Sequence, residues 1–307
     1  MSVRALLLTL GLAAAAAMPA PSRAAEALTG TLQKIQETGT IALGVRDSSV
    51  PFSYLDDQQR PVGYALDICM KVADAVKREL GRPDLKVETN PVTSSTRIPL
   101  MANGTIDLEC GSTTNNLDRQ RQVAFSNTYF LTASRFVAKR DAHLDSIDDL
   151  RGKTVVSTSG TTNIVQLNKV NAARGLGITV IAAKDHAEAF LMVETGRASA
   201  FVMDDVLLAS LIASSKDPGA YAISSAAFSA AEPYAIMLRR DDPQFKAVVD
   251  RATAALYQGT EGPALYHRWF EAPIPPRGIN LNLPMSPALR GAFEHPSDAA
   301  DPASYGS

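Results

Sequence analysis

The chain has 307 residues, enough for about two domains of ordinary size. Hydrophobic residues make up 46% and charged residues 20%, close to the average for soluble globular proteins, so the composition excludes a disordered chain and a fibrous repeat. Thirty basic residues against 32 acidic ones give a formal charge of -2. Since binding to nucleic acid by counterion release needs a basic excess, we expect no nucleic-acid partner.

The first 24 residues have the pattern of a secretory signal peptide. Arg4 precedes an apolar run at Ala5–Met18, and the small residues Ser22 and Ala24 form a cleavage pattern. The run is shorter than the roughly 20 residues that a membrane-spanning helix needs. We therefore expect cleavage after Ala24 and a soluble product in the periplasm.

Two cysteines, Cys69 and Cys110, would enter an oxidising compartment after export. Their spacing does not decide between one disulfide and two buried thiols, so both remain open. The four histidines are isolated and lack the H-x-x-H or C-x-x-C spacing of a zinc site. We expect no metal and no other cofactor.

Short β-branched runs alternate with helical stretches in the first part of the chain, which indicates an α/β fold. In one such stretch the apolar residues recur every three or four positions, and Gly81 and Pro83 end it. The expected elements are a strand at Thr40–Val45, a helix at Ala65–Leu80, a strand at Leu85–Pro91, a helix at Thr96–Asn103 and a strand at Ile106–Cys110.

A second series with the same alternation begins after Lys153, so we expect a second α/β lobe. Its expected elements are a strand at Thr154–Ser157, a helix at Thr162–Ala173, a strand at Ile178–Ala182, a helix at His186–Glu194, a strand at Ala200–Met203 and a helix at Asp205–Ser214. Two later helices, at Pro243–Tyr257 and Gly262–Phe270, are expected to return to the first lobe.

Two apolar, strand-like segments, Thr132–Ala138 and Glu232–Leu238, lie between one series and the next. Two connections rather than one predict a hinge. We expect a first lobe formed by residues 25–133 and 234–307, and a second lobe formed by residues 134–233. The proline-rich tail from Pro273 is expected to wrap over the surface.

Polar residues after the strands of the first lobe form one half of a candidate site, because ligands of open α/β sheets bind beyond the carboxyl ends of the strands. Arg46 follows the first strand, as a ligand contact or as a solvated loop residue. Ser94 precedes a helix whose first turn holds Arg97. An arginine there opposes the helix dipole, a cost that an anionic ligand offsets; the alternative is a merely exposed side chain.

After the third strand, a polar stretch contains Ser112 and Thr114 and leads to Arg119. Small residues with free backbone groups allow a ligand to approach closely. This stretch completes the part of the candidate site that we expect from the first lobe.

The second lobe offers Thr162, His186 and Asp204 at equivalent positions. Thr162 follows a turn between strand and helix, which suits an anion or ordinary capping. A lone histidine is often structural, so His186 has both interpretations. Asp204 has a better claim on a ligand than Asp205, because Asp205 is placed to cap the next helix.

Together these positions supply three arginines, several hydroxyls, one histidine and one aspartate. A guanidinium group forms two charge-assisted hydrogen bonds with one carboxylate, so three arginines suit a ligand with more than one carboxylate. One aspartate suits an ammonium group. The residues therefore predict a receptor for an acidic amino acid.

The same stretches resemble the periplasmic glutamate/aspartate-binding proteins of ABC importers, within solute-binding protein family 3, over nearly all of the expected mature chain. The segments that carry the resemblance are GVRDSSVPFSY from Gly44, TSSTRIPLMANGTIDLECGSTTNN from Thr93, STSGTTN from Ser157, AKDHAEAF from Ala183, FVMDDVLLA from Phe201 and LRRDDPQFK from Leu238. The resemblance implies a type II periplasmic-binding-protein fold, in which two α/β lobes joined by a two-strand hinge close over one amino acid.

The resemblance also implies a role for each matching residue. The side-chain carboxylate of the ligand would be held by Arg46, Ser94, Arg97 and His186. The α-carboxylate would be held by Arg119, Thr162 and the amide of Thr114, and the α-ammonium by Asp204, Ser112 and Thr114. Related receptors often have threonine three residues before the arginine of the α-carboxylate site, where this chain has Asn116. Arg121 is the alternative if the register at Arg119 is wrong.

We expect a monomer that captures L-glutamate or L-aspartate and delivers it to the membrane subunits of an ABC permease. The chain has no G-x-x-x-x-G-K-[ST] loop, so a separate ATPase would drive transport. One alternative is a cyclohexadienyl dehydratase-like enzyme, in which His186 and Asp204 act as acid and base. Another is a ligand-sensing module on the same fold. The chain has no G-x-S-x-G motif for a serine nucleophile, and we expect binding rather than catalysis.

Overall fold

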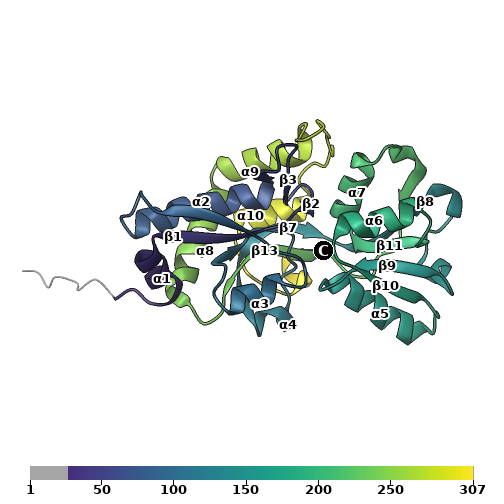
Figure 1. Cartoon of the computed structure of the whole chain (residues 1–307), viewed down its shortest axis with the longest axis horizontal. Coiled ribbons are helices and arrows are strands. Elements are labelled where there is room, and N and C mark those ends of the chain that lie inside the picture. Colours follow the sequence, from purple (N-terminus) through teal and green to yellow (C-terminus); the bar gives the residue numbers. More distant parts are fainter. Residues whose placement is uncertain (1–26, 307) are drawn as a thin grey trace, which may run out of the picture.

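The computed structural model describes residues 27–306, so the predicted signal peptide and its cleavage site lie outside the described residues. Two lobes lie side by side along the longest axis of the molecule (Figure 1). The chain passes from the first sheet to the second at Ala133 and returns between Ile223 and Glu232. No helix within residues 27–306 is long and apolar enough to cross a membrane.

The first lobe is built on a five-stranded sheet with the order β5-β1-β6-β13-β7. Its strands are β1 (Thr40–Val45), β5 (Lys86–Pro91), β6 (Leu108–Glu109), β7 (Val123–Thr132) and β13 (Glu232–Arg239). β5, β1 and β6 are parallel, whereas β13 runs antiparallel to β6 and β7. The parallel strands end at one edge of the sheet, where Arg46 and the polar stretch after β6 begin.

Helices and a small sheet complete the first lobe. They are α1 (Gly30–Thr38), β2 (Ser48–Ser49), β3 (Ser53–Leu55), β4 (Pro61–Val62), α2 (Tyr64–Glu79), α3 (Arg97–Ala102), α4 (Leu117–Gln120), α8 (Pro243–Gln258), α9 (Glu261–Tyr266), η4 (His267–Glu271), α10 (Pro287–Glu294) and η5 (Pro302–Tyr305). α2 buries one face because its apolar residues, such as Ile68, Val72 and Val76, repeat at helical spacing. This helix follows the sequence prediction to within one residue at each end.

The second lobe has its own five-stranded sheet, with the order β10-β9-β11-β8-β12. Its strands are β8 (Ser134–Lys139), β9 (Thr154–Thr158), β10 (Thr179–Ala183), β11 (Ala200–Asp204) and β12 (Tyr221–Ile223). Its helices are η1 (Arg140–Ala142), η2 (Ile147–Leu150), α5 (Thr162–Arg174), α6 (His186–Glu194), α7 (Asp205–Ser214) and η3 (Pro218–Ala220). β9, β10 and β11 are parallel, so their carboxyl ends meet at the edge that faces the first lobe.

The connections between the lobes are shorter than the sequence predicts. The sequence predicts that Thr132–Ala138 and Glu232–Leu238 join the lobes, but most of each segment belongs to a sheet. Ser134 pairs with Asp204 in the second sheet, and Glu232 pairs with Thr132 in the first. Strand pairing thus extends to the boundary on both sides and leaves little chain between the lobes.

A disulfide joins Cys69 of α2 to Cys110, with 6.0 Å between the two Cα atoms. The sequence left this pairing open. Both residues are fully buried in the core of the first lobe. The bond links α2 to the residue that follows β6, directly before the polar stretch of the candidate site.

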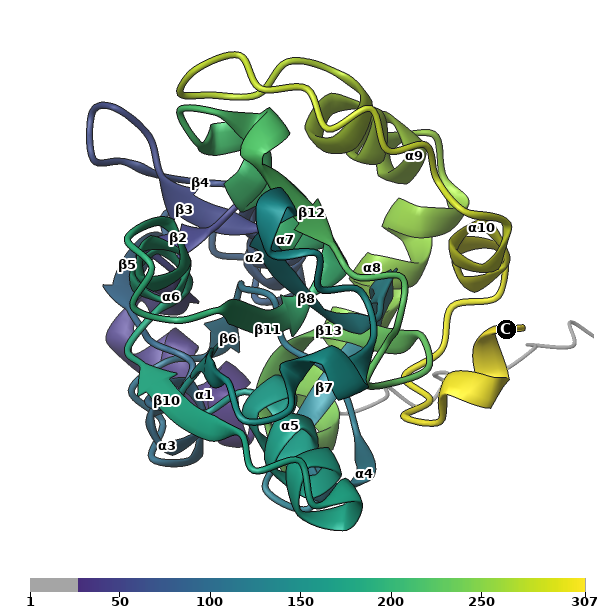
Figure 2. The ribbon, with the colours of Figure 1, turned by 90° about the vertical axis from the view of Figure 1, so that its right-hand side faces the viewer.

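The C-terminal tail is more ordered than the surface wrap that the sequence predicts. Ser286 caps α10, because its Oγ accepts a hydrogen bond from the Leu289 N–H at 3.2 Å, and Leu289 is buried. The tail runs down one side of the molecule to the C-terminus (Figure 2). It also reaches the second lobe, where Arg277 Nη1 donates to the Ser214 carbonyl of α7 at 3.3 Å.

Candidate ligand-binding site

Arg46 lies directly after β1 and is 2% exposed. Its Nη2 donates a hydrogen bond to Ser94 Oγ at 2.9 Å, and its backbone N–H donates to Ser53 Oγ at 2.8 Å. Its Nη1 is buried and has no hydrogen-bond partner among residues 27–306. The structure therefore brings two predicted site residues, Arg46 and Ser94, into direct contact and leaves one donor of the guanidinium group available.

Arg97 begins α3, as the sequence predicts, and its side chain is also buried. Its Nη1 donates to the Ser112 carbonyl at 2.9 Å and to Thr113 Oγ1. Within the described chain, Nε has no partner. In an arginine, the Nε–H points to the same edge of the guanidinium plane as Nη2. The contacts through Nη1 therefore orient Arg97 and leave its Nε edge available.

Arg119 lies on α4 with only 7% of its surface exposed. Asn116 caps this helix, because its Oδ1 accepts a hydrogen bond from the Arg119 backbone N–H at 2.9 Å. Asparagine is at least as good an N-cap as threonine, so the departure at Asn116 leaves α4 in place. Arg121, the alternative, is exposed and pairs with Asp118 at 3.5 Å.

Arg119 also bridges the two lobes. Its Nη1 donates to the Thr114 carbonyl at 2.9 Å, and its Nη2 donates to the Gly160 carbonyl of the second lobe at 3.2 Å. Thr114 Oγ1 lies 3.4 Å from Thr162 Oγ1. These contacts place the predicted α-carboxylate group, Arg119, Thr114 and Thr162, at the closed interface.

Gly160 has φ +77° and lies against the first lobe. A Cβ at this position would lie 2.6 Å from the Ser94 carbonyl oxygen, closer than real side-chain carbons come. A short distance away, Ser95 Oγ donates to Ser159 Oγ at 3.2 Å. The turn before α5 therefore has no side chain where the backbones of the two lobes meet.

His186 begins α6 and is 1% exposed. Its Nδ1 lies 2.8 Å from Thr158 Oγ1, and its buried Nε2 has no partner in the described part of the chain. Burial lowers the pKa of His186 well below its usual range, and the nearby charges of Arg46 and Arg97 lower it further. The imidazole is therefore neutral at neutral pH and has one buried nitrogen available.

Asp204, at the end of β11, is 3% exposed and is held by two donors. Its Oδ1 accepts from Asn163 Nδ2 at 2.8 Å, and its Oδ2 accepts from the Tyr234 hydroxyl. The sequence predicts that Asp205 caps α7, but Asp204 holds the N-cap position and Asp205 is the first helical residue. Asp205 Oδ1 still accepts from the Val206 N–H of α7 at 2.8 Å, and it also accepts from Thr132 Oγ1 at 2.6 Å, beside the lobe connection.

The buried polar atoms without a partner concentrate at this interface. Nine such side-chain atoms occur within residues 27–306. Four of them belong to residues predicted for the site, namely Arg46 Nη1, Arg97 Nε, Ser112 Oγ and His186 Nε2. A fifth, Glu109 Oε1, lies beside Arg97. Because buried polar groups are normally paired, their convergence marks a site that suits a polar ligand.

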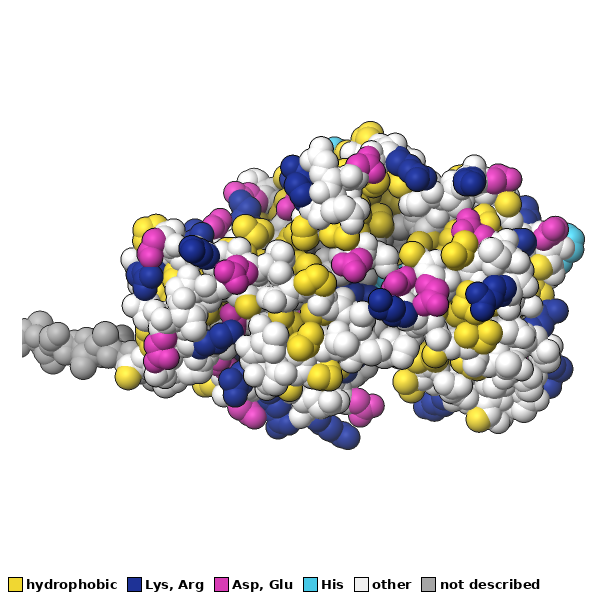
Figure 3. Space-filling model, in the orientation of Figure 1, with side chains coloured by type: hydrophobic (Ala, Val, Ile, Leu, Met, Phe, Trp, Pro, Cys, Tyr) yellow, Lys and Arg dark blue, Asp and Glu magenta, His cyan; other side chains and the backbone are white. Residues whose placement is uncertain are grey.

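The electrostatics of the site favour an anion. Burial and, to a smaller extent, the charge of Arg97 lower the pKa of Arg46 to about 10 and that of Arg119 to about 9. On the face drawn in Figure 3, by contrast, basic and acidic side chains are interspersed. Three mutually repelling guanidinium groups are therefore gathered in the interior, where an anionic ligand would relieve their repulsion.

Sequence reasoning missed several residues of the site. Glu109 and Thr113 are completely buried and contact Arg97, and both lie in the segment DLECGSTTNN that carries the resemblance. The even spacing of Glu109 and Thr113 in the stretch after the third strand was the sequence signal that could have indicated them. No local sequence signal indicates Tyr234, because its partner Asp204 lies 30 residues away in the other lobe.

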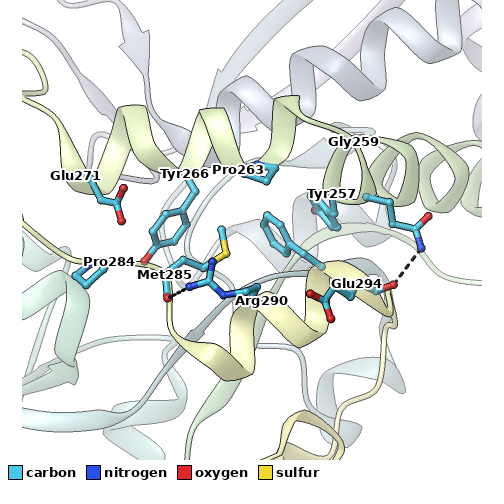
Figure 4. Close-up of a pocket in the computed structure, with 11 residues that line it drawn as sticks. Tyr257, Gly259, Pro263, Tyr266, Glu271, Pro284, Met285, Arg290 and Glu294 are labelled. Atoms are coloured by element: carbon cyan, nitrogen blue, oxygen red, sulfur yellow. Dashed lines mark hydrogen bonds between the residues drawn. The ribbon is translucent and has the colours of Figure 1, made fainter.

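Another cavity, of about 600 Å³, lies between α9 and α10 (Figure 4). Tyr257, Tyr266 and Phe293 line it, with the charged side chains of Arg290 and Glu294. Within residues 27–306, none of the nine buried polar atoms that lack a hydrogen-bond partner belongs to a residue that lines this cavity. The cavity lacks the predicted site residues and the buried donors that gather between the lobes.

Comparisons with known proteins show which family this chain is similar to. The sequence profile of the bacterial extracellular solute-binding proteins, family 3, matches residues 41–272. The curated L-glutamate/L-aspartate-binding protein of Pseudomonas aeruginosa is 50% identical over 287 residues, which cover 93% of this chain and 94% of the relative. The glutamate/aspartate import solute-binding protein of Escherichia coli is 45% identical over 291 residues, covering 95% and 96%.

Solved structures show the same fold. An ArgBP mutant from T. maritima superposes with a TM-score of 0.69 at 26% identity, covering 78% of this chain and 99% of that one. An ancestral amino acid-binding protein, described as a precursor of cyclohexadienyl dehydratase, superposes with a TM-score of 0.66 at 26% identity, covering 78% and 99%. The predicted type II periplasmic-binding fold is confirmed.

Proposed function

The chain belongs to the bacterial extracellular solute-binding proteins of family 3, and from this premise we propose that it captures L-glutamate or L-aspartate between its lobes. The observation that carries the proposal is the convergence of buried donors on one place, above all Arg46 Nη1 and Arg97 Nε. The names of the 45–50% identical relatives support the same ligands. Export to the periplasm and delivery to an ABC permease, by a monomeric receptor, are part of the proposal.

In this proposal the side-chain carboxylate lies between the two lobes. Arg46 Nη1 and the Nε edge of Arg97 donate from the first lobe, and Ser94 orients Arg46 through its hydrogen bond at 2.9 Å. His186 donates from the second lobe. If the Thr158 hydroxyl donates to Nδ1, the neutral ring carries its proton on Nε2, which then faces the carboxylate as a donor.

The α-amino-acid group lies at the Arg119 end. Arg119, Thr162 and the amide of Thr114 hold the α-carboxylate, in keeping with the contacts that already link these residues across the interface. Asp204 accepts from the α-ammonium together with Ser112 and Thr114. Asn163 and Tyr234 hold the carboxylate of Asp204 from behind, so that it is oriented before the ligand arrives.

Capture proceeds by closure of the lobes about their short connections. The contacts of Arg119 with Gly160 and of Ser95 with Ser159 form as the lobes meet, and closure excludes water from the carboxylates. A carboxylate loses hydration worth several kcal/mol on burial, so each oxygen must meet a donor. Only the closed form then presents both lobes to the permease in the bound arrangement.

Catalysis is the alternative to binding, and the similarity to an ancestral precursor of a dehydratase keeps it relevant. We infer that the chain is not an enzyme, because its two acid–base candidates are engaged otherwise. His186 Nδ1 contacts a threonine rather than a carboxylate, and both oxygens of Asp204 accept hydrogen bonds. Incubation with prephenate or arogenate should give no product; a new product would overturn this inference.

The direct test is calorimetric titration of protein that has been unfolded, stripped of ligand and refolded. L-Glutamate or L-aspartate should bind tightly at one site per chain. L-Glutamine should bind at least about fivefold more weakly, because its amide leaves buried donors poorly paired at a cost of about 1 to 3 kcal/mol. L-Arginine serves as the cationic control. Equal affinity for glutamate and glutamine, or no binding of any of the four, would contradict the proposal.

A further inference from the structure

A buried carboxylate lies among the arginines of the candidate site. Glu109, the last residue of β6, has no exposed surface. Its Oε1 lies 3.8 Å from Arg97 Nη1, and its Oε2 accepts a hydrogen bond from Thr113 Oγ1. An anion receptor gains nothing from a second anion in its interior unless that anion has a role, because an ionised group is costly to bury.

The backbone places Glu109 in the site through an alternation of residues. Glu109, Gly111 and Thr113 are two residues apart, and the hydrogen bond from Thr113 Oγ1 to Glu109 Oε2 shows that the side chains of Glu109 and Thr113 lie on the same side. A Cβ on Gly111 would clash with Glu109 Oε1 and lie 2.8 Å from Arg46 Cγ. Glycine at this position therefore lets the carboxylate of Glu109 pack close to Arg46.

Thr113 transmits the influence of Glu109 to Arg97. A carboxylate can only accept, so the Thr113 hydroxyl donates its proton to Glu109 and accepts from Arg97 Nη1 through a lone pair. The Ser112 carbonyl accepts the other Nη1 hydrogen bond. This arrangement engages Nη1 fully and directs the opposite Nε edge toward the ligand.

Glu109 also sets the charge of the closed site. The buried charged side chains there are the guanidinium groups of Arg46, Arg97 and Arg119 and the carboxylates of Glu109 and Asp204. Three positive and two negative groups leave one net positive charge below pH 7, where the partly buried Glu232 beside Asp204 and Arg119 is mostly protonated because burial raises its pKa to about 7. An acidic amino acid, with two carboxylates and one ammonium, carries one net negative charge and balances it.

Without Glu109 the same site would carry two net positive charges. It would then balance a dicarboxylate that has no ammonium group, because such a ligand carries two negative charges. Burial lowers the pKa of Arg46 and of Arg119, and the charge of Glu109 acts in the opposite direction on both. Its field therefore reaches guanidinium groups at both ends of the ligand.

We propose that Glu109 is a specificity-determining residue, which selects dicarboxylates with an ammonium group over dianionic dicarboxylates by setting the net charge of the closed site to +1. This proposal rests on the proposed function, because it assumes that the ligand is an acidic amino acid. Glu109 acts through Arg97 and through its charge and is a positioning residue without contact to the ligand.

The experiment compares L-glutamate with glutarate, its analogue without the ammonium group, by direct and competition calorimetry. Glu109→Gln keeps an oxygen that can accept from Thr113, removes the charge and replaces the other oxygen by an NH2 group. The ratio of the glutarate Kd to the glutamate Kd should fall at least about tenfold in this variant. Glu109→Asp keeps the charge and should retain the ratio of the unmodified protein.

Thr113→Val is the matched control, because it breaks the contact with Arg97 without changing the charge. It should weaken both ligands and leave their ratio within about threefold of the original value. Thermal unfolding and circular dichroism establish that each variant is folded. A folded Glu109→Gln variant with an unchanged ratio, or with glutarate still below detection, would contradict the proposal.

A second measurement needs no variant. Calorimetry of the unmodified protein at pH 6, where Glu232 is mostly protonated, in two buffers with different ionisation enthalpies, reports protons taken up on binding. Glutamate should bind with proton uptake near zero. Glutarate carries one more negative charge than the site can balance, so it should bind with uptake approaching one proton. Equal uptake for both ligands would overturn the role of Glu109 even if the variants fail to fold. If the unmodified protein binds neither ligand, the proposed function fails instead.

Discussion

The site between the lobes and the cavity between α9 and α10 differ in what they bury. The cavity has a volume of about 600 Å³, but its Arg290 and Glu294 are exposed to solvent. Between the lobes, by contrast, a cavity of about 200 Å³ is lined by residues of both lobes, including Arg46 and Lys184. Arg46 and Arg97 are each only 2% exposed.

The difference teaches that open volume and binding chemistry are separate properties. An arginine in water is already solvated, so a ligand that contacts Arg290 gains little over water. A buried guanidinium group with a free donor is poorly solvated, so a carboxylate that reaches it replaces missing hydrogen bonds. We therefore expect ligand binding in the region with buried donors, even where little empty space is visible.

The comparison is tested most strongly by truncating one arginine in each region. Arg97→Ala should weaken glutamate binding by about 2 to 5 kcal/mol, at least about thirtyfold, because the buried carboxylate loses a charged donor. Arg290→Ala should leave the Kd unchanged within about twofold. Calorimetric titration measures both, and a similar loss in the two variants would remove the distinction between the regions.

The ammonium end of the ligand allows a second test of the cleft. Asp204→Asn should weaken glutamate binding by about 1.5 to 3 kcal/mol, roughly ten- to hundredfold, because the ammonium loses its charged acceptor. Glu271→Gln in the lining of the α9–α10 cavity is the matched control and should have no effect. Undiminished affinity in the Asp204→Asn variant would place the ammonium elsewhere.

The pH dependence of stability should also distinguish the two regions. Burial and, to a smaller extent, the charge of Asp204 raise the pKa of Glu232 from 4.5 to about 7. The folded state thus binds this proton more tightly, and ionisation lowers the free energy of unfolding as the pH rises through this window. Glu232→Gln should remove the loss and stabilise the protein at pH 8 by at most about 3 kcal/mol, with no gain near pH 4.

Urea unfolding of ligand-free protein at pH 4, 6 and 8 measures this effect. Gln258→Ala, which removes a neutral side chain from the lining of the α9–α10 cavity, is the control and should show the same difference from the unmodified protein at every pH. A Glu232→Gln variant whose advantage does not grow between pH 4 and pH 8 would contradict the assigned pKa.

The smallest expected effect concerns the α9–α10 cavity itself. Phe293 stacks on Tyr257 with 4.6 Å between ring centroids and is buried. Phe293→Leu should cost about 1 kcal/mol of stability and lower the Tm by a few degrees, because the stacked pair is lost. The glutamate Kd should not change. A clear loss of affinity at an unchanged fold would show that this region contributes to binding.

Local patterns predicted most helices well because those signals are confined to short segments. α2 was predicted as Ala65–Leu80 and spans Tyr64–Glu79, since apolar spacing and the following Gly81 define it locally. α10 was missed, although Ser286 followed by Pro287 is a recognisable helix start. The proline count of the tail masked that signal.

The candidate site was predicted residue by residue but not contact by contact. Position after a strand was enough to single out Arg46, His186 and Asp204, because strand ends meet at one edge of each sheet. Their roles as ligand contacts stay predictions. The hydrogen bonds of Asp204 with Asn163 and Tyr234 join residues 30 or more positions apart, and no local pattern contains them.

By itself, the sequence determined the family, the two α/β lobes and the set of polar residues at the strand ends, because these depend on local periodicity and on motifs in order. Only the tertiary structure decided the Cys69–Cys110 disulfide, the donors left without partners and the place of Glu109 among the arginines. These depend on distances between segments far apart in the chain, and burial and net charge exist only once those segments pack together.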